Sequence, residues 1–167
     1  MAKIRVALVE DHDLTRMALR KSLQQRQEIE WVGEASSGSE GLALLQDTFP
    51  DVGIVDIGLP DIDGIEVTKL FKEGSPQAKT KILILTLHNN QSEVLAAFGA
   101  GADSYCMKDI SSEMLWEALK ATQEGNAWID PAIARIVLSQ ATSPSQPDSS
   151  NLSNRVPVAA PSSVNTE

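Results

Sequence analysis

Short apolar runs alternate with amphipathic stretches along the first three quarters of the chain. The runs are rich in β-branched residues and have the length of buried strands. Between them, apolar side chains recur near helical spacing. The pattern predicts strands at residues 4–9, 31–35, 52–55, 82–85 and 104–107, and helices at residues 14–25, 41–47, 65–73, 91–100 and 112–124. Such alternation predicts an α/β fold in which helices cover a buried parallel sheet.

The pattern changes after the fifth predicted helix. Ser111 or Ser112 is a suitable N-cap for that helix, and Gly125 suits a left-handed residue after its end. Residues 129–138 predict a further short helix with Pro131 near its start. From Ser139 the chain has no aromatic residue and is rich in serine and proline. We therefore predict a domain at residues 1–125, a short helix within 126–138, and a disordered linker or tail at 139–167.

The composition limits the kinds of partner. The net charge is −9 and the isoelectric point is near 4.7, so this chain is a poor match for nucleic acid and favours cations or basic partners. A single cysteine, Cys106, lies in an apolar run and is predicted to be a buried thiol in a reducing compartment. No apolar run approaches the ~20 residues of a membrane span. The sequence therefore predicts a cytoplasmic protein without membrane contact.

Acidic residues follow two of the predicted strands. Glu10 and Asp11 come directly after the first strand, and Asp56 comes after the third. Right-handed crossovers place the carboxyl ends of parallel strands at one edge of the sheet, where ligands bind. Carboxylates gathered there repel one another unless a cation intervenes, and Mg²⁺ fits such a set of oxygen ligands. Thr86 and Lys108 end or follow the fourth and fifth strands, and we expect them at the same edge.

Ordinary structural roles compete with functional ones at these positions. A single aspartate at a strand end is usually a cap or a loop residue, and only the convergence of several acids favours a site. Asp61 and Asp63 are interpreted as loop residues, because Asp63 and Gly64 form a turn sequence before the third helix. His12 and His88 are not assigned to the site, since neither has a second histidine at ligand spacing.

Together these residues resemble the receiver domain of bacterial response regulators in two-component signal transduction. The resemblance extends over residues 3 to about 125. It rests on the acidic pair after the first strand, on the acid after the third strand with its following turn, and on single residues at the ends of the last two strands. Those residues are Glu10, Asp11, Asp56, Leu59, Pro60, Asp63, Gly64, Thr86, Tyr105 and Lys108. The resemblance implies a flavodoxin-like, doubly wound sheet of five parallel strands in the order 2-1-3-4-5, flanked by five helices.

The resemblance also implies a role for each site residue. Asp56 is the expected phosphoacceptor, and Lys108 is expected to contact a phosphoryl oxygen. Thr86 is expected to bind another phosphoryl oxygen and to move inward, with Tyr105 following as the aromatic switch residue. The expected ligands of Mg²⁺ are Asp11, Asp56 and the carbonyl of Gly58, with Glu10 acting through water.

A signalling switch that assists its own phosphorylation and dephosphorylation is expected, in place of an enzyme. Its implied partner is a histidine kinase, and phosphorylation is expected to alter the fourth helix, fifth strand and fifth helix and to promote a homodimer. Gly58 and His88 flank the expected phosphoryl position, and Leu87 is bulky where receivers are more often small; together they leave the phosphate lifetime open in either direction.

Asp109 and the helix at residues 129–138 resemble the NarL/FixJ subgroup. Members of that subgroup carry a C-terminal helix-turn-helix domain. We therefore expect a fragment of a transcription regulator that does not itself bind nucleic acid. One alternative is a stand-alone receiver that acts by protein contact or by phosphorelay. Another is a Mg²⁺-dependent nuclease or primase-type module, in which Asp61 and Asp63 would be essential and which the acidic composition disfavours.

Overall fold

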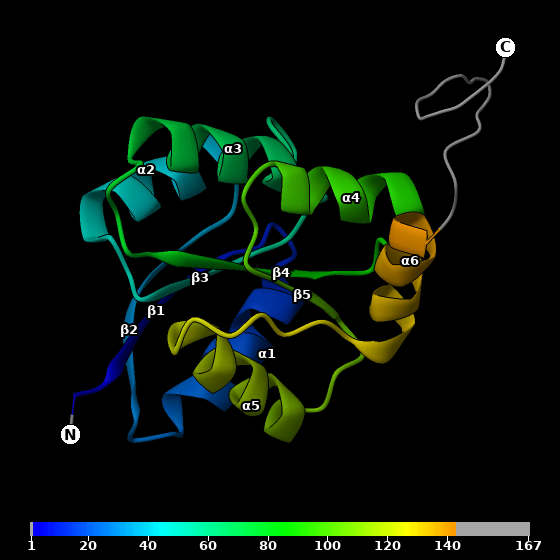
Figure 1. The fold of residues 1–167 in the computed structure, drawn as a ribbon. Helices are drawn as coiled ribbons and strands as arrows, with labels where there is room; N and C mark the ends of the chain where they lie inside the picture. The colour runs from blue at the N-terminus through cyan, green and yellow to red at the C-terminus, as the bar shows by residue number, and fades with distance from the viewer. Residues whose placement is uncertain (1, 143–167) are drawn as a thin grey trace, which may run out of the picture. The chain divides into compact units, whose positions relative to one another are not determined.

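Five parallel strands form the centre of the molecule. The structure is a computed structural model that describes residues 2–142. Its single sheet has the strand order β2-β1-β3-β4-β5, which confirms the expected doubly wound topology (Figure 1). The strands are β1 (Ile4–Val9), β2 (Ile29–Ala35), β3 (Val52–Val55), β4 (Lys81–Thr86) and β5 (Ser104–Met107). The predicted bounds are confirmed for β1, β3 and β5, while β2 starts two residues earlier and β4 extends by one residue at each end.

Helices cover both faces of this sheet. These helices are α1 (Asp13–Gln24), α2 (Gly38–Thr48), α3 (Gly64–Gly74), α4 (Gln91–Gly99) and α5 (Ser112–Gln123), and a further helix, α6 (Pro131–Thr142), follows them in the chain. Figure 1 shows α1 and α5 on one face and α2, α3 and α4 on the other. The strands are therefore buried on both faces, which explains why they are continuous apolar runs in the sequence.

Side-chain caps define where four of the helices begin. Ser37, Asp63, Asn90 and Ser111 each accept a hydrogen bond from the backbone amide three residues later. The predicted start of α2 was three residues late, because its first turn contains Gly38 and Ser39 instead of apolar residues. At the end of α5, Gly125 has φ 93°, which confirms the predicted left-handed residue.

The outer edge of β5 is paired with the segment that follows α5. The Tyr105 amide donates to the Trp128 carbonyl at 2.9 Å, and the Asp130 amide donates to the Tyr105 carbonyl at 3.3 Å. The Asp130 carboxylate also accepts from the Met107 amide at 2.7 Å. This segment satisfies backbone groups that an open edge strand would expose, and it leads directly into α6.

Residues 1–134 form one compact unit, and a second unit begins at Arg135. Helix α6 continues to Thr142, four residues beyond the predicted helix end at Leu138. Most of the predicted linker, from residue 143 to residue 167, lies outside the described residues. No helix in the described part of the chain has both the length and the apolar character needed to cross a membrane.

Candidate metal centre

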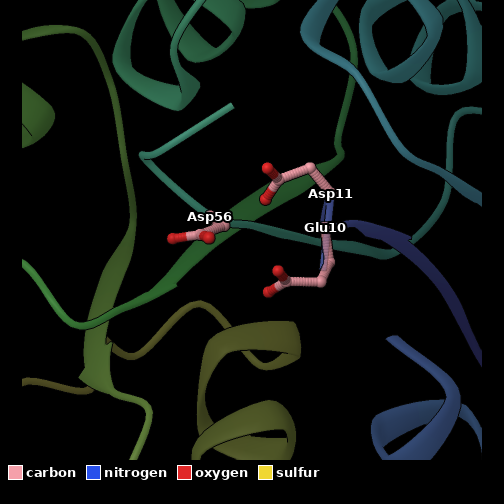
Figure 2. Close-up of side chains that lie close together, drawn as sticks. All are labelled: Glu10, Asp11 and Asp56. Atoms are coloured by element: carbon pink, nitrogen blue, oxygen red, sulfur yellow. The ribbon is translucent and has the colours of Figure 1, made fainter. Parts of the chain in front are cut away.

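Three carboxylates meet at the carboxyl edge of the sheet. Glu10 and Asp11 follow β1, and Asp56 follows β3, which pairs directly with β1 so that Val9 lies beside Val55. One carboxylate oxygen from each acid can be chosen so that all three lie within 4.8 Å of one another. Figure 2 shows the three side chains pointing to the same side of the strand ends. The structure therefore brings together the acids that the sequence placed at this edge.

Burial differs among the three clustered acids. Glu10 is 1% exposed and Asp56 is 6% exposed, whereas Asp11 is exposed. Within the described part of the chain, the Asp11 carboxylate has no hydrogen-bond or ion-pair partner. Three carboxylate oxygens, one of them open to solvent, form a donor set suited to a hard divalent ion that keeps several waters. These residues therefore fit the Mg²⁺ expected from the sequence.

Lys108 contacts two of the three acids. Its Nζ lies 2.8 Å from Glu10 Oε1 and 2.9 Å from Asp56 Oδ2. Its backbone amide donates to the Thr86 carbonyl at 2.9 Å, which continues the pairing of β5 with β4 beyond the strand end. Burial lowers the pKa of Lys108, but hydrogen bonds to Glu10 and Asp56 outweigh this effect, so the pKa is raised above its ordinary value. Lys108 is therefore a fixed positive charge in the cluster.

Several backbone groups and one arginine hold Glu10 in place. Its amide donates to the Ala35 carbonyl at 3.0 Å, and its carboxylate accepts from the His12 amide at 3.0 Å. Its carbonyl accepts from Nη1 of Arg16 at 2.8 Å. Arg16 carries no signal in the sequence, because an arginine in the first turns of an amphipathic helix usually lies on the solvated face.

The two acids of the β3–α3 loop have different partners. Asp61 accepts hydrogen bonds from the amides of Gly38 at 2.6 Å and Ser39 at 2.9 Å, so it caps the start of α2. Hydrogen bonds from Ser39 hold the pKa of Asp61 well below its usual range. Asp63 is the N-cap of α3 and accepts from the Glu66 amide at 2.9 Å. Both are loop residues, as predicted, and the structure adds that both carboxylates accept hydrogen bonds from backbone amides at helix starts.

Comparison with known families assigns this arrangement. The model of the response regulator receiver domain matches residues 6–120 of this chain. The chain belongs to the response regulator receiver family. A receiver is a signalling switch. The clustered acids, Lys108 and the strand order β2-β1-β3-β4-β5 agree with membership of this family. The nuclease or primase-type alternative is set aside.

Similar proteins place this receiver near regulators of the LuxR and NarL type. It is 35% identical over 130 residues to the response regulator protein VraR of Staphylococcus aureus, covering 78% of this chain and 61% of VraR. The chain thus spans about three fifths of the length of the curated relatives that it matches.

Solved structures give the same picture. A two-component response regulator of the LuxR family from Aurantimonas sp. SI85-9A1 superposes with a TM-score of 0.77 at 30% identity, covering 85% of this chain and all of that one. The receiver domain of a NarL regulator from Mycobacterium tuberculosis superposes with a TM-score of 0.71 at 28% identity, covering 75% of this chain and all of that one. These similarities support the predicted NarL/FixJ-type subgroup.

The two predicted switch residues of this receiver both contact the backbone of His88. Thr86 is fully buried at the end of β4, and its hydroxyl accepts from the His88 amide at 3.2 Å. Tyr105 is also buried, and its hydroxyl donates to the His88 carbonyl at 2.6 Å. Burial raises the pKa of the Tyr105 hydroxyl, so it stays protonated and able to donate. Thr86 and Tyr105 are thus linked through the β4–α4 loop.

Glycines shape the loop that carries Asp56. A Cβ added at Gly64 would lie 2.0 Å from the carbonyl oxygen of Asp56, so only glycine allows α3 to begin this close to the strand end. At Gly58, an added Cβ would meet nothing nearer than His88 Nε2 at 3.5 Å. The imidazole of His88 is held by Glu93, whose carboxylate lies 2.9 Å from Nδ1. Gly58 therefore leaves open space beside the site, while Gly64 fixes the backbone.

Cys106 and His12 have no part in the acidic cluster. Cys106 is fully buried, and burial raises the pKa of its thiol, as expected of an unreactive core cysteine. The Nδ1 atom of His12 lies 3.2 Å from the hydroxyl of Thr15, within the first turn of α1. Among the described residues, the group that could hold a metal ion contains Glu10, Asp11 and Asp56 and neither histidine.

Proposed function

We propose that this receiver accepts a phosphoryl group on Asp56 in a Mg²⁺-dependent reaction, with the phosphohistidine of a histidine kinase as donor. The observation that carries the proposal is the meeting of Glu10, Asp11 and Asp56 with the Nζ of Lys108. Lys108 pairs with the two buried acids, whereas the exposed Asp11 has no partner among the described residues and can bind a cation. A phosphoacceptor needs such an arrangement of a carboxylate nucleophile, a cation-binding acid and a lysine.

The chemistry follows from this arrangement. A carboxylate oxygen of Asp56 attacks phosphorus, a new O–P bond forms, and the bond from phosphorus to the donor nitrogen breaks as the imidazole leaves. A Mg²⁺ ion bound by Asp11, Asp56 and the Gly58 carbonyl, with Glu10 acting through water, would neutralise the charge of the phosphoryl oxygens. Lys108 releases Asp56 and donates to a phosphoryl oxygen instead. Positioning and charge neutralisation do most of the work in such transfers, so no acid-base pair is needed.

The same residues that support phosphorylation support its loss by hydrolysis. Gly58 has no side chain to block the site, and the nearest group to a Cβ added there would be His88 Nε2 at 3.5 Å. We therefore describe the protein as a switch that assists its own phosphorylation and dephosphorylation and turns over no separate metabolite. The single buried cysteine suits the cytoplasm, where its kinase partner would meet it.

Phosphorylation is proposed to act through Thr86 and Tyr105. A phosphoryl group beside Lys108 offers oxygens to the Thr86 hydroxyl, which now accepts from the His88 amide. If Thr86 turns toward the phosphoryl group, the β4–α4 loop loses that contact, and the Tyr105 hydroxyl bonded to His88 moves with it. The backbone of Tyr105 pairs with residues 128–130. A change at Asp56 is thereby passed to the surface of α4, β5 and α5 and to the segment before α6.

The output is proposed to be transcription, with phosphorylation promoting a homodimer. A solved structure of RcsB, which is 26% identical to this chain and superposes with a TM-score of 0.72, contains two dimers bound to DNA. With its net charge of −9 this chain is a poor match for DNA, so we assign DNA binding to another part of the whole regulator. Sedimentation of the phosphorylated and unphosphorylated chain tests the dimer.

Intact mass measurement after incubation with acetyl phosphate and Mg²⁺ tests the phosphoacceptor role. We expect one phosphoryl adduct on the parent protein, none on Asp56→Asn, and strong suppression when a chelator is added. The Asp61→Asn variant is the matched control, because it removes an acid at the same edge while the three gathered carboxylates remain. An adduct that persists in Asp56→Asn, or that forms equally well with chelator, would refute the proposal.

A further inference from the structure

Arg16, on the first turns of α1, has more partners than an ordinary surface arginine. Its side chain is only 17% exposed. Its three nitrogen atoms have separate acceptors: Nη1 donates to the Glu10 carbonyl at 2.8 Å, Nη2 to Asp13 at 2.6 Å, and Nε to Glu34 at 3.3 Å. The proposed function assigns Arg16 no role. Its contacts nevertheless connect the metal centre with α1 and with strand β2.

The contact with Glu10 lies where the sheet's own hydrogen bonding stops. The carbonyl of Val9 accepts from the Asp56 amide at 3.0 Å, and the amide of Glu10 donates to the Ala35 carbonyl at 3.0 Å. The next carbonyl, that of Glu10, has passed the end of β1 and accepts from Arg16 instead. The orientation of this peptide group fixes how the chain turns from Glu10 into Asp11. Arg16 therefore acts at the peptide that joins two of the three gathered acids.

We infer that Arg16 is a positioning residue, which holds the peptide between Glu10 and Asp11 so that both carboxylates face a bound dication. The inference rests on the proposed function, since it concerns the affinity of that site for Mg²⁺. Asp13 and Glu34 hold the guanidinium in place, and the guanidinium in turn fixes the orientation of the Glu10 carbonyl. Residues one step removed from the ligands commonly change metal affinity by about 10-fold to 100-fold when they are replaced.

If Arg16 acts through its charge, its removal should change the affinity for Mg²⁺ in one direction, and if it acts as a positioning residue, in the other. A positive side chain near a cation site repels the cation, so removing Arg16 would tighten Mg²⁺ binding if charge were its only influence. Removing a positioning residue weakens binding, because the ligands lose their arrangement. The direction of the change in affinity therefore separates the two roles, whatever happens to overall stability.

Arg20 provides the matched control on the same helix. It lies one turn after Arg16 and contacts Glu34 at 2.6 Å. Replacing it removes the same charge and the same kind of ion pair, and leaves the contact from Arg16 to Glu10 intact. Arg16→Lys keeps the charge, but one ammonium group cannot reproduce a planar fork with three separate acceptors.

The experiment is a titration of the full chain with Mg²⁺ by calorimetry, repeated with Mn²⁺ by electron paramagnetic resonance, at a temperature well below unfolding. We expect Arg16→Ala to weaken binding about 10-fold, Arg16→Lys to weaken it by a smaller factor, and Arg20→Ala to change it by less than about twofold. Amide resonances of Asp11 and His12 should shift in Arg16→Ala and stay in place in Arg20→Ala.

Two results would overturn the inference. Unchanged or tighter binding in Arg16→Ala overturns the inference, as does an equal loss in Arg16→Ala and Arg20→Ala. If Arg16→Ala does not fold, the comparison of Arg16→Lys with the parent decides in the same way. If the parent protein itself binds no Mg²⁺ or Mn²⁺, the proposed metal centre fails, which is a different outcome from a failure of the role of Arg16.

Discussion

Two groups of acids lie near the same edge of the sheet and have opposite surroundings. In the first group, the carboxylates of Glu10, Asp11 and Asp56 face one another, and Lys108 compensates two of them. In the second group, Asp61 and Asp63 each accept hydrogen bonds from backbone amides at the start of a helix. The second group is satisfied by backbone amides, whereas in the first group the Asp11 carboxylate has no partner among the described residues.

This difference shows what separates a functional acid from a structural one. Both groups consist of carboxylates in segments that follow strands at this edge, so the presence of acids there does not separate them. The distinguishing property is whether the carboxylates face backbone amides or face one another. An acid cluster with too few donors raises the energy of the folded state unless a ligand binds. The clustered acids therefore indicate a ligand site, and the helix-capping acids indicate local stability.

Removing Lys108 should have the largest effect on the first group. Lys108→Ala leaves Glu10 and Asp56 buried without their cation, which typically costs about 3 kcal/mol of unfolding free energy. It also removes a donor to the phosphoryl group, which should slow formation of the adduct at least about 100-fold. Urea unfolding and timed intact mass measure the two effects. A variant with parent-like stability and rate would contradict the role of Lys108.

The next effect concerns the backbone that carries Asp56. Gly64→Ala forces a Cβ against the Asp56 carbonyl, and we expect a loss of about 3 kcal/mol because the clash is with backbone and not with a flexible side chain. Gly58→Ala, six residues earlier in the same loop, meets only ordinary contact and should change stability by less than about 0.5 kcal/mol. Equal losses in the two variants, measured by urea unfolding, would show that the loop adjusts freely.

Removing a helix-capping acid should give a smaller effect, which lowers stability and leaves phosphorylation intact. Asp63→Ala deletes the side-chain cap of α3, and the expected loss of stability is about 1 kcal/mol. The adduct should still form on Asp56, because Asp63 is not one of the clustered acids. Thermal unfolding and intact mass measure the two properties. Loss of the adduct in a folded Asp63→Ala protein would merge the two groups and remove the distinction.

The smallest expected effect is a gain in stability. Asp11→Asn relieves repulsion within the cluster and breaks no hydrogen bond or ion pair of the described residues, so the metal-free protein should be stabilised by less than about 1 kcal/mol. Mg²⁺ stabilises the parent by binding the folded state, and this increment should be largely lost in Asp11→Asn. Melting temperatures with and without Mg²⁺ measure both changes. A destabilised metal-free variant would show that Asp11 has a structural role.

The sequence was sufficient to predict the sheet, the helices and the gathered acids. Buried parallel strands have a strong apolar signal, and the crossover rule then places Glu10, Asp11 and Asp56 at one edge without any knowledge of side-chain contacts. Lys108 was found in the same way, because it directly follows β5. The short first turn of α2 was missed, since its glycine and serine residues carry no periodic apolar signal.

Other features depended on contacts that spacing does not encode. Arg16 reaches back from α1 to a backbone carbonyl, and no sequence pattern distinguishes it from Arg20. The pairing of residues 128–130 with β5 is likewise invisible, because a segment of that length has no strand periodicity. The roles of Thr86 and Tyr105 came from family resemblance alone, and the structure adds that both contact His88.

The most direct test is to locate the phosphoryl group itself. The protein would be phosphorylated with acetyl phosphate and Mg²⁺, treated with borohydride to reduce the acyl phosphate, and digested for peptide mass analysis. The account predicts a reduced side chain at position 56 and none at positions 61 and 63. Reduction at either helix-capping acid, or at no acid in a protein that had gained a phosphoryl adduct, would contradict the claim that the clustered carboxylates form the phosphoacceptor site.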